Sequence, residues 1–424
     1  MEPRSAPPVE DHRLGTADFW QRPAEERDEV FARLRAEQPL SRHPAPDDML
    51  GIGERDERPF WAVVRYDDIR RVSRDPRTFR SGAGVLFGDA PPEMLEASLS
   101  FLAMDAPRHT KLRGLVSSAF TPRQVARIEE GIRANARLVV REAAERGQAG
   151  GGGAGDFVEL IAKRLPLMTI SEMVGVPEAD RERVVAAADT LVTALDEDSW
   201  GDVPPLQKLG EALWTLTETS TQLAAERAAS PREDLMTALV QAEIDGDRLT
   251  HAEIAAFFVL LAVAGNDTTR HTTSHAMRAL TTNPDQRALL QRDLDATLPT
   301  AVEEFIRWAT PVLTFRRTTT VPVELHGVEI PADEKVLLFY HSGNRDERAF
   351  ERPWRFDVTR DPNHHLGFGG GGPHYCLGAS LARTQLRALF GELLTTLPGL
   401  EVGEPSLYRT PGFIHAVKTM PCVW

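Results

Sequence analysis

The stretch that most constrains this chain is a glycine-rich loop that ends on a cysteine and runs directly into a helical pattern. The loop covers residues 367–378 with the sequence GFGGGGPHYCLG, and we expect a helix from residue 379 to about residue 397. Glycines lack side chains and tolerate positive φ, so this backbone can lie close against a flat partner. A thiol at a helix N-terminus is surrounded by unpaired N–H groups at the positive end of the helix dipole. Such surroundings lower a thiol pKa, and we therefore expect Cys376 to be present as a thiolate.

A thiolate held by a bare backbone loop is the arrangement that an axial ligand of haem iron requires. Three alternatives remain open for the same loop. Cys376 can be an inert loop thiol, or it can form a disulfide with Cys422, although two cysteines in 424 residues do not favour an oxidising compartment. Gly367, Gly369 and Gly372 also fit the dinucleotide-binding pattern G-x-G-x-x-G. The residues before them form a turn pattern, however, where that fingerprint needs a strand.

The composition is that of an ordinary soluble globular protein, with 42% hydrophobic and 26% charged residues. The net charge of −14 argues against nucleic acid as a partner. Residues 1–13 are polar and proline-rich, unlike a signal peptide, and the longest apolar run, residues 254–265, is too short to span a bilayer. We therefore expect a cytoplasmic protein without a membrane span. Helical patterns of similar composition flank the glycine-rich residues 147–155, which predicts one domain over residues 1–424.

The strongest helical pattern covers residues 250–280 and is interrupted by polar residues at its centre. Thr250 and Glu253 form a capping box at its start, and the apolar first half predicts a path through the interior. The sequence AGNDTT follows at residues 264–269. Thr268 can donate to the carbonyl four residues earlier and bend the helix, which opens a groove beside Asp267. A groove with an acid and an alcohol suits proton delivery to bound dioxygen; a kink around a satisfied core aspartate is the alternative.

Two further pairs stand at helical spacings that place both members on one face. His109 and Arg113 are four residues apart, which suits either a solvated face or the carboxylates of a ligand. Glu304 and Arg307 are three residues apart and are flanked by apolar residues. Most such pairs are exposed ion pairs that contribute little to stability, but the apolar neighbours of this pair favour burial.

Two further pairs, one of arginines and one of histidines, are not both expected to bind a ligand. Arg316 and Arg317 lie in an extended segment, where successive side chains point to opposite faces, so only one of them can face a given ligand. His271 and His275 are four apart, a spacing that can bind zinc, but no third ligand is evident and the sequence lacks the H-E-x-x-H pattern. We interpret the two histidines as ordinary helix residues.

The cysteine loop resembles the haem-binding signature of the cytochrome P450 family, F-x-x-G-x-[HR]-x-C-x-G. Gly372, His374, Cys376 and Gly378 stand at the family spacing. Phe368 lies eight residues before the cysteine, where the family has seven, so the loop is one residue longer. The other motifs follow in the family's order, including the acid–threonine motif of residues 264–269, which is similar to the oxygen-activating motif.

The resemblance implies a mainly α fold with small β-sheets and a haem b group. It implies that Asp267 and Thr268 assist oxygen activation and that Cys376 is the metal ligand. The third member of a buried network with Glu304 and Arg307 is expected at Arg355, in the segment PWRF. The remaining cofactor-binding residues implied by the resemblance are His109, Arg113, Arg317, His374 and Gly378.

The implied activity is that of a haem-thiolate monooxygenase, which inserts one oxygen atom from O2 into a C–H bond of a hydrophobic substrate. Electrons would come from a ferredoxin and an NAD(P)H-dependent ferredoxin reductase, with Lys111, Arg383 and Arg387 as candidate docking residues. Several segments look like an actinobacterial subgroup that acts on steroids, terpenoids or branched lipids. Tailoring of a polyketide or another antibiotic-type metabolite is the alternative, and a haem-binding sensor or carrier is the non-enzymatic one.

Overall fold

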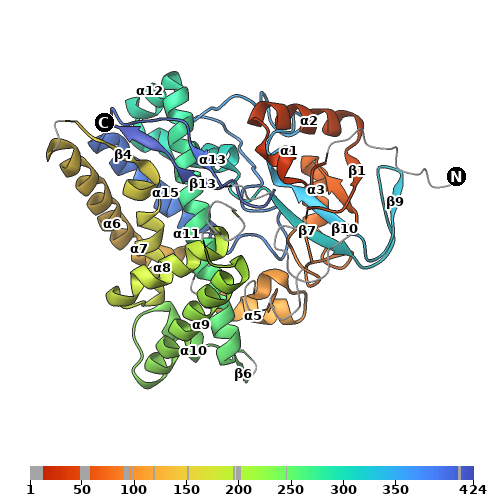
Figure 1. The fold of residues 1–424 in the computed structure, drawn as a ribbon, viewed down its shortest axis with the longest axis horizontal. Helices are drawn as coiled ribbons and strands as arrows, with labels where there is room; N and C mark the ends of the chain where they lie inside the picture. Colours follow the sequence, from red (N-terminus) through yellow and green to blue (C-terminus); the bar gives the residue numbers. More distant parts are fainter. Residues whose placement is uncertain are drawn as a thin grey trace.

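The computed structural model describes residues 13–47, 58–89, 95–96, 100–117, 120–149, 152–193, 196, 202–244, 246–408 and 412–424. Helices dominate this part of the chain, and the strands form small sheets, which confirms the mainly α fold class. In Figure 1 most helices lie on one side of the molecule, whereas α1–α3 pack beside the largest sheet on the other side.

The helices of the described residues differ widely in length. The longer helices are α2 (Ala24–Glu37), α3 (Tyr66–Arg74), α5 (Arg108–Ser117), α6 (Pro122–Ala149), α7 (Arg164–Val174), α8 (Glu178–Thr193), α9 (Pro205–Ala229), α11 (His251–Thr282), α12 (Pro284–Arg292), α13 (Leu294–Ala309) and α15 (Ala379–Thr396). The shorter ones are α1 (Ala17–Gln21), α10 (Leu235–Gln241), α14 (Tyr340–Gly343), the 3-10 turn η1 (Ser100–Ala103) and the π-helical turn η3 (Val158–Ala162).

The largest sheet has five strands in the order β1-β2-β10-β7-β3, all antiparallel neighbours except β2 and β10, which run parallel. Its strands are β1 (Leu40–His43), β2 (Phe60–Val63), β3 (Phe79–Arg80), β7 (Thr314–Thr319) and β10 (Lys335–Phe339). A three-stranded sheet contains β4 (Ala154–Asp156), β11 (Glu401–Val402) and β14 (Pro421–Val423). Three hairpins are formed by β5 (Glu243–Ile244) with β6 (Asp247–Arg248), β8 (Val323–Leu325) with β9 (Val328–Ile330), and β12 (Ser406–Leu407) with β13 (Val417–Thr419).

Helix α11 runs through the centre of the molecule, as its sequence predicted (Figure 1). The capping box is formed, because Thr250 accepts from the Glu253 N–H and the Glu253 carboxylate accepts from the Thr250 N–H. On the C-terminal side of residues 264–269, buried hydroxyl groups form hydrogen bonds within the helix. Thr273 donates to the Thr269 carbonyl at 2.9 Å, and Ser274 donates to the Arg270 carbonyl at 3.1 Å. The helix can therefore carry polar residues through the core without unpaired hydroxyls at these positions.

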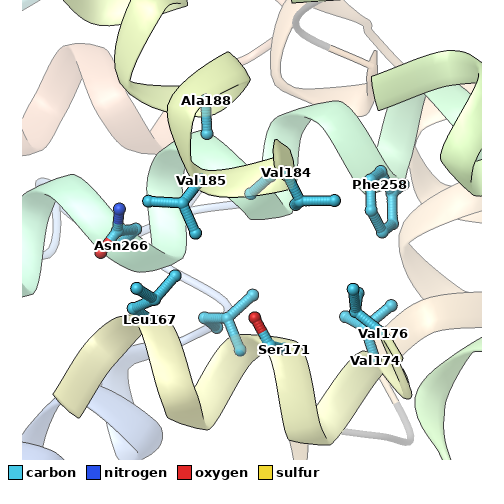
Figure 2. A pocket seen from close by; sticks show the side chains of 11 residues that line it. Leu167, Ser171, Val174, Val176, Val184, Val185, Ala188, Phe258 and Asn266 are labelled. Carbon is cyan, nitrogen blue, oxygen red and sulfur yellow. The ribbon is translucent and has the colours of Figure 1, made fainter. Parts of the chain in front are cut away.

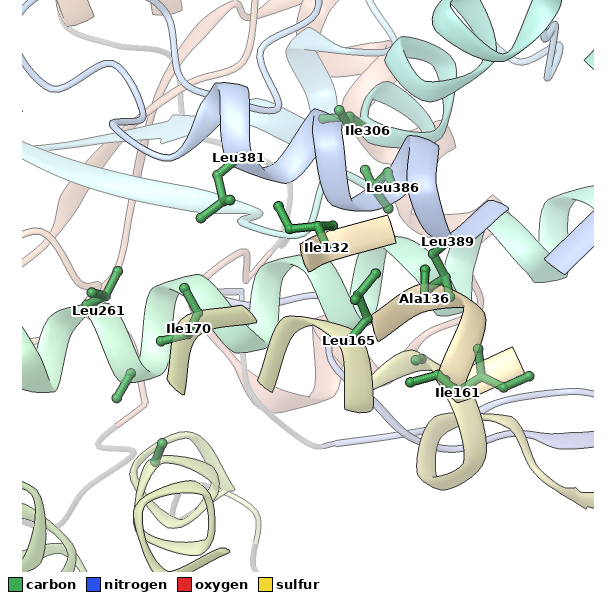
Figure 3. Packing of buried hydrophobic residues seen from close by; sticks show 14 of the residues in the cluster. Ile132, Ala136, Ile161, Leu165, Ile170, Leu261, Ile306, Leu381, Leu386 and Leu389 are labelled. Carbon is green, nitrogen blue, oxygen red and sulfur yellow. The ribbon is translucent and has the colours of Figure 1, made fainter. Parts of the chain in front are cut away.

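Packing around α11 defines the main hydrophobic core. Helices α7, α8, α9, α13 and α15 all contact it, and Figure 3 shows side chains from α6, α7 and α15 converging beside it. Within the described residues, α11 is the one helix whose length and composition would allow it to cross a membrane, and most of that segment is buried inside the protein. Its apolar surface is thus used in packing.

The glycine-rich residues 147–155 differ from the loop that the sequence suggested. Helix α6 extends to Ala149, and Ala154–Asp156 forms strand β4, which pairs with β14 near the C-terminus. A three-residue strand rich in glycine has no hydrophobic alternation, so sequence pattern alone does not identify it. The pairing joins the end of α6 to the last strand of the chain.

Candidate functional site

A large cavity lies between α11, α15 and the cysteine loop. The empty space that its walls enclose, including the part open to solvent, is about 1360 Å³. Apolar side chains make up most of its wall, among them Phe101, Phe257, Leu261, Val312 and Phe315. The walls of the cavity therefore favour apolar ligands.

The cysteine loop forms one wall of this cavity. The Cys376 N–H donates to the Phe368 carbonyl at 3.0 Å, and both residues line the cavity. Gly369, Gly371 and Gly372 have φ values of 93°, 92° and 76°, a region that favours glycine. A Cβ atom at Gly372 would lie 2.3 Å from the Ser73 carbonyl oxygen, at the end of α3. The extra residue of the loop therefore lies in a glycine run pressed against α3, and Phe368 remains beside the cysteine.

The electrostatics of the Cys376 thiol differ from the expectation. Its side chain is accessible from the cavity but otherwise surrounded by protein, and this burial raises the pKa of the thiol. The Gly378 N–H and the cations Arg113 and Arg383 act in the opposite direction, but they do not outweigh burial. The expected thiolate is thus not produced by the helix N-terminus alone, because desolvation penalises the charged form. A metal ion at the sulfur would displace the proton.

A cluster of four basic side chains lies at the cysteine-loop side of the cavity. The rings of His109 and His374 are 4.3 Å apart between centroids. Burial, together with the positive charges nearby, lowers the pKa of His374 to about 2; the charged neighbours are Arg317, His109 and Arg113. Buried His109 Nε2 has no hydrogen-bond partner among the described residues. Four donors crowded together in this way suit the carboxylates of a ligand.

The sequence placed Arg316 and Arg317 on opposite faces of a strand, and β7 confirms this. Arg317 lies with the basic cluster, where its charge acts on both histidines. Arg316 points the other way and binds the loop of residues 84–89. Its Nη1 lies 2.5 Å from Asp89 Oδ1, and its Nε lies 3.3 Å from the Gly84 carbonyl oxygen. Arg317 Nη1 donates to the Arg316 carbonyl oxygen at 2.8 Å. Arg317 therefore belongs to the basic cluster, whereas Arg316 anchors a loop.

These observations together fit a haem b group. A thiol lies on the wall of the cavity, and three glycines of the same loop, Gly367, Gly369 and Gly378, also line it. The buried Nε2 atom of His109 lacks a hydrogen-bond partner among the described residues. Of the residues expected at this group, Arg113, His374, Cys376 and Gly378 line the cavity itself. Haem propionates would supply the carboxylates that the basic cluster lacks.

The acid–threonine motif lies on the α11 wall. Thr268 lines the cavity and donates to the Ala264 carbonyl at 2.8 Å, which confirms the expected hydrogen bond. Asp267 lies behind it and is 2% exposed. Neither of its carboxylate oxygens has a hydrogen-bond partner in the described part of the chain. Burial raises the pKa of Asp267 to about 7, although the positive charge of Arg270 acts to lower it. This acid can therefore take up and release a proton near neutral pH.

Sequence reasoning did not single out Arg270. Its Nη2 atom lies 2.5 Å from Asp267 Oδ1, although the two are not aligned as a hydrogen bond, and its Nη1 donates to Asp189 Oδ1 at 3.0 Å. Asp189 is on α8 and is partly exposed. The spacing of three residues between Asp267 and Arg270 was the available signal, because it places both on one helix face.

The expected third member of the buried network, Arg355, is wrong. Glu304 and Arg307 are both fully buried and form a two-pronged ion pair at 2.7 Å. The third member is Arg360, whose Nε lies 3.1 Å from Glu304 Oε2. Arg355 has an exposed side chain and contributes its carbonyl oxygen, which accepts from Arg307 at 3.3 Å and Arg360 at 2.9 Å. The segment is irregular, so spacing along the sequence does not fix which arginine turns inward.

The candidate docking residues are mostly engaged within the protein. Lys111 pairs with Asp247. Arg383 holds Glu303 with two hydrogen bonds of 2.7 and 2.8 Å. Arg387 is exposed on α15. Of the three, Arg387 has an exposed side chain, whereas Lys111 and Arg383 are held in ion pairs.

The competing sites from the sequence find no support in the described residues. His271 Nδ1 accepts from the Val417 N–H, and His275 donates to the His415 carbonyl at 2.9 Å. No group of three or more side chains within the described ranges is arranged to hold a metal ion. Both cysteines are free, so the disulfide alternative is excluded.

Comparisons with known proteins agree with this geometry. The cytochrome P450 family model matches residues 54–398. The chain belongs to the cytochrome P450 family. Methyl-branched lipid omega-hydroxylase of Mycobacterium tuberculosis is 42% identical over 98% of this chain and 95% of its own length. Steroid C26-monooxygenase of Mycolicibacterium smegmatis is 37% identical over 92% of this chain and 88% of its own length.

Among solved structures, cytochrome P450 CYP268A2 of Mycobacterium marinum in complex with pseudoionone is 54% identical to this chain. It has a TM-score of 0.93 and covers 99% of this chain and 100% of its own. This P450 is a haem-dependent monooxygenase. Haem supplies the activation of dioxygen when bound.

Proposed function

We propose that this P450 hydroxylates a methyl-branched lipid, a steroid or a terpenoid. The observation that carries the proposal is the large apolar cavity above Cys376, whose walls are dominated by aromatic and aliphatic side chains. Burial of apolar surface at about 25 cal/mol per Å² would supply most of the binding energy for such a substrate. The two relatives, a methyl-branched lipid omega-hydroxylase and a steroid C26-monooxygenase, support the same class of substrate.

In this proposal Cys376 is the iron ligand, and Gly378 with its neighbours leaves room for the flat ring. The basic cluster of His109, Arg113, Arg317 and His374 binds the propionates. Thr268 holds a hydroxyl at the cavity wall, and Asp267 behind it passes protons toward that wall. The support for these last two roles is the cavity position of Thr268 and the pKa of Asp267 near neutrality.

We also propose the surroundings in which the enzyme works. Electrons arrive from a ferredoxin and its NAD(P)H-dependent reductase, and Arg387 contributes to the docking face. The protein is cytoplasmic, and residues 1–424 form one domain. If turnover with a ferredoxin is independent of ionic strength, docking by surface charge is wrong, because exposed charge pairs are screened by salt.

The test is an optical titration of the haem-loaded enzyme with a methyl-branched fatty acid, a steroid ketone and a terpenoid ketone. A shift of the Soret band from low spin toward high spin, followed by a hydroxylated product with reducing partners, supports the proposal. A polyketide that shifts the band when none of the lipids does would favour the tailoring alternative. A ligand-induced shift without any product, given active partners, would favour a sensor or carrier.

A further inference from the structure

A second, smaller cavity lies beside the large one, between α7, α8 and α11. The empty space that its walls enclose, including the part open to solvent, is about 360 Å³, and the part that a water molecule can enter is much smaller. Figure 2 shows side chains of α8 and α7 facing each other across it, with Val184 and Val185 on one side and Leu167 and Ser171 on the other. Its lining is almost entirely apolar. This space has no role in the chemistry described above.

One side chain, Ile170 of α7, lines both cavities; the other residues of the small cavity do not line the large one. A Cβ atom at Gly265 would lie 2.6 Å from Ile170 Cδ1, so Ile170 occupies a notch in α11 that exists because position 265 has no side chain. Figure 3 shows Ile170 reaching toward α11 near Leu261. Helix α11 separates the two cavities, because Leu261 and Gly265 line the large one and Ala262 and Asn266 line the small one. Ile170 packs beside α11 at this point and is the one side chain among the described residues that reaches both cavities.

We propose that Ile170 is a specificity-determining residue that closes a side arm of the substrate cavity. Its branched side chain limits how far an alkyl chain can extend across α11. When that side chain is shortened, the small cavity becomes continuous with the large one and accepts additional methylene or methyl groups of the ligand.

The chemistry of the small cavity defines what it accepts. Aliphatic walls favour an uncharged hydrocarbon end. The buried Asn266 Oδ1 lines the cavity and has no hydrogen-bond partner among the described residues. This oxygen is an acceptor, so it suits a hydroxyl or one water molecule and disfavours a carboxylate. Alkyl and hydroxyalkyl ends are therefore the expected occupants.

The test uses 1-alkylimidazoles with chains of four to twelve carbons and the haem-loaded enzyme. The imidazole ring binds haem iron and shifts the Soret band whatever the natural substrate is, so this test is independent of the lipid proposal. For the unchanged protein we expect affinity to rise with chain length and then level off. For Ile170→Ala we expect the rise to continue, by about fourfold for each further methylene, because burying one contributes about 0.8 kcal/mol.

The matched control is Leu167→Ala, on the same helix. Leu167 lines the small cavity and not the large one, so this change enlarges the arm by the same number of carbons and leaves the wall in place. Ile170→Val removes only Cδ1, the atom in the notch, and should give an intermediate profile even if the alanine variant folds poorly. Equal chain-length profiles for the unchanged protein, Ile170→Val and Leu167→Ala would overturn the proposal.

Discussion

Replacement of Arg360 by alanine should destabilise the protein much more than replacement of Arg355, five residues earlier. The Arg360 side chain is 10% exposed and its partner Glu304 is fully buried. It donates to Glu304 and to three carbonyl oxygens, those of Glu351, Arg352 and Arg355. Its removal leaves a buried carboxylate with one cation in place of two, and it leaves several acceptors unpaired.

The magnitude follows from the burial of this network. Breaking a buried ion pair by removing one partner costs about 3–5 kcal/mol. With a melting entropy of about 2.1 cal/mol/K per residue, a chain of 424 residues should lose about 3–6 °C in Tm. Arg355→Ala should stay within about 0.5 kcal/mol, as exposed substitutions do.

Scanning calorimetry of both haem-loaded variants, at equal haem occupancy, measures this difference directly. Equal occupancy matters because a bound cofactor itself raises stability. A loss of Tm in Arg355→Ala as large as that in Arg360→Ala would refute the reasoning, because it would mean that the Arg355 side chain also stabilises the network.

Three other outcomes are expected. Asp267→Asn should lower turnover by about 10²–10⁴-fold at little cost in substrate affinity. Because the pKa of Asp267 is raised from 3.8 to about 7, its contribution to the free energy of unfolding is complete below about pH 4 and is lost as pH rises to 7. Asp267→Asn should therefore remove this part of the pH dependence of the unfolding free energy, measured by denaturant titration at several pH values. Arg317→Ala should weaken haem binding by about 10–150-fold, the loss of a hydrogen bond to a charged group, as measured by haem transfer to an acceptor protein; Arg316→Ala, on the opposite face, should not. Cys376→Ala should abolish the thiolate-type spectrum of the carbon monoxide complex, whereas Cys422→Ala should retain it, and the reverse pattern would rule out Cys376 as the ligand.

The features that the sequence predicted well depend on local spacing. The capping box of Thr250 and Glu253, the hydrogen bond from Thr268 to the Ala264 carbonyl, and the opposed directions of Arg316 and Arg317 all arise within four residues. Helix and strand geometry fixes such relations before any tertiary contact forms. The mainly α fold follows from the same local patterns.

The features that the sequence predicted poorly depend on contacts between distant segments. Arg355 and Arg360 share an irregular segment, and only the position of Glu304 decides which of them is buried. The pKa of the Cys376 thiol is set by burial, which outweighs the helix N-terminus. The charge partner of Asp267 is tied to Asp189 on another helix. Tertiary packing decides each of these outcomes.

The contact between the cysteine loop and the end of α3 has a consequence for protein engineering. Gly370, Gly371 and Gly372 each face Ser73 or Arg74 so closely that an added methyl group would meet atoms at 2.3–2.8 Å. A mutant library built around the cavity should therefore treat this part of α3 as part of the cysteine loop, although some 300 residues separate the two in the sequence. Tolerance to substitution at Ser73 and Arg74 will depend on the loop that they support, and paired randomisation of both segments will recover variants that changes in either one alone exclude.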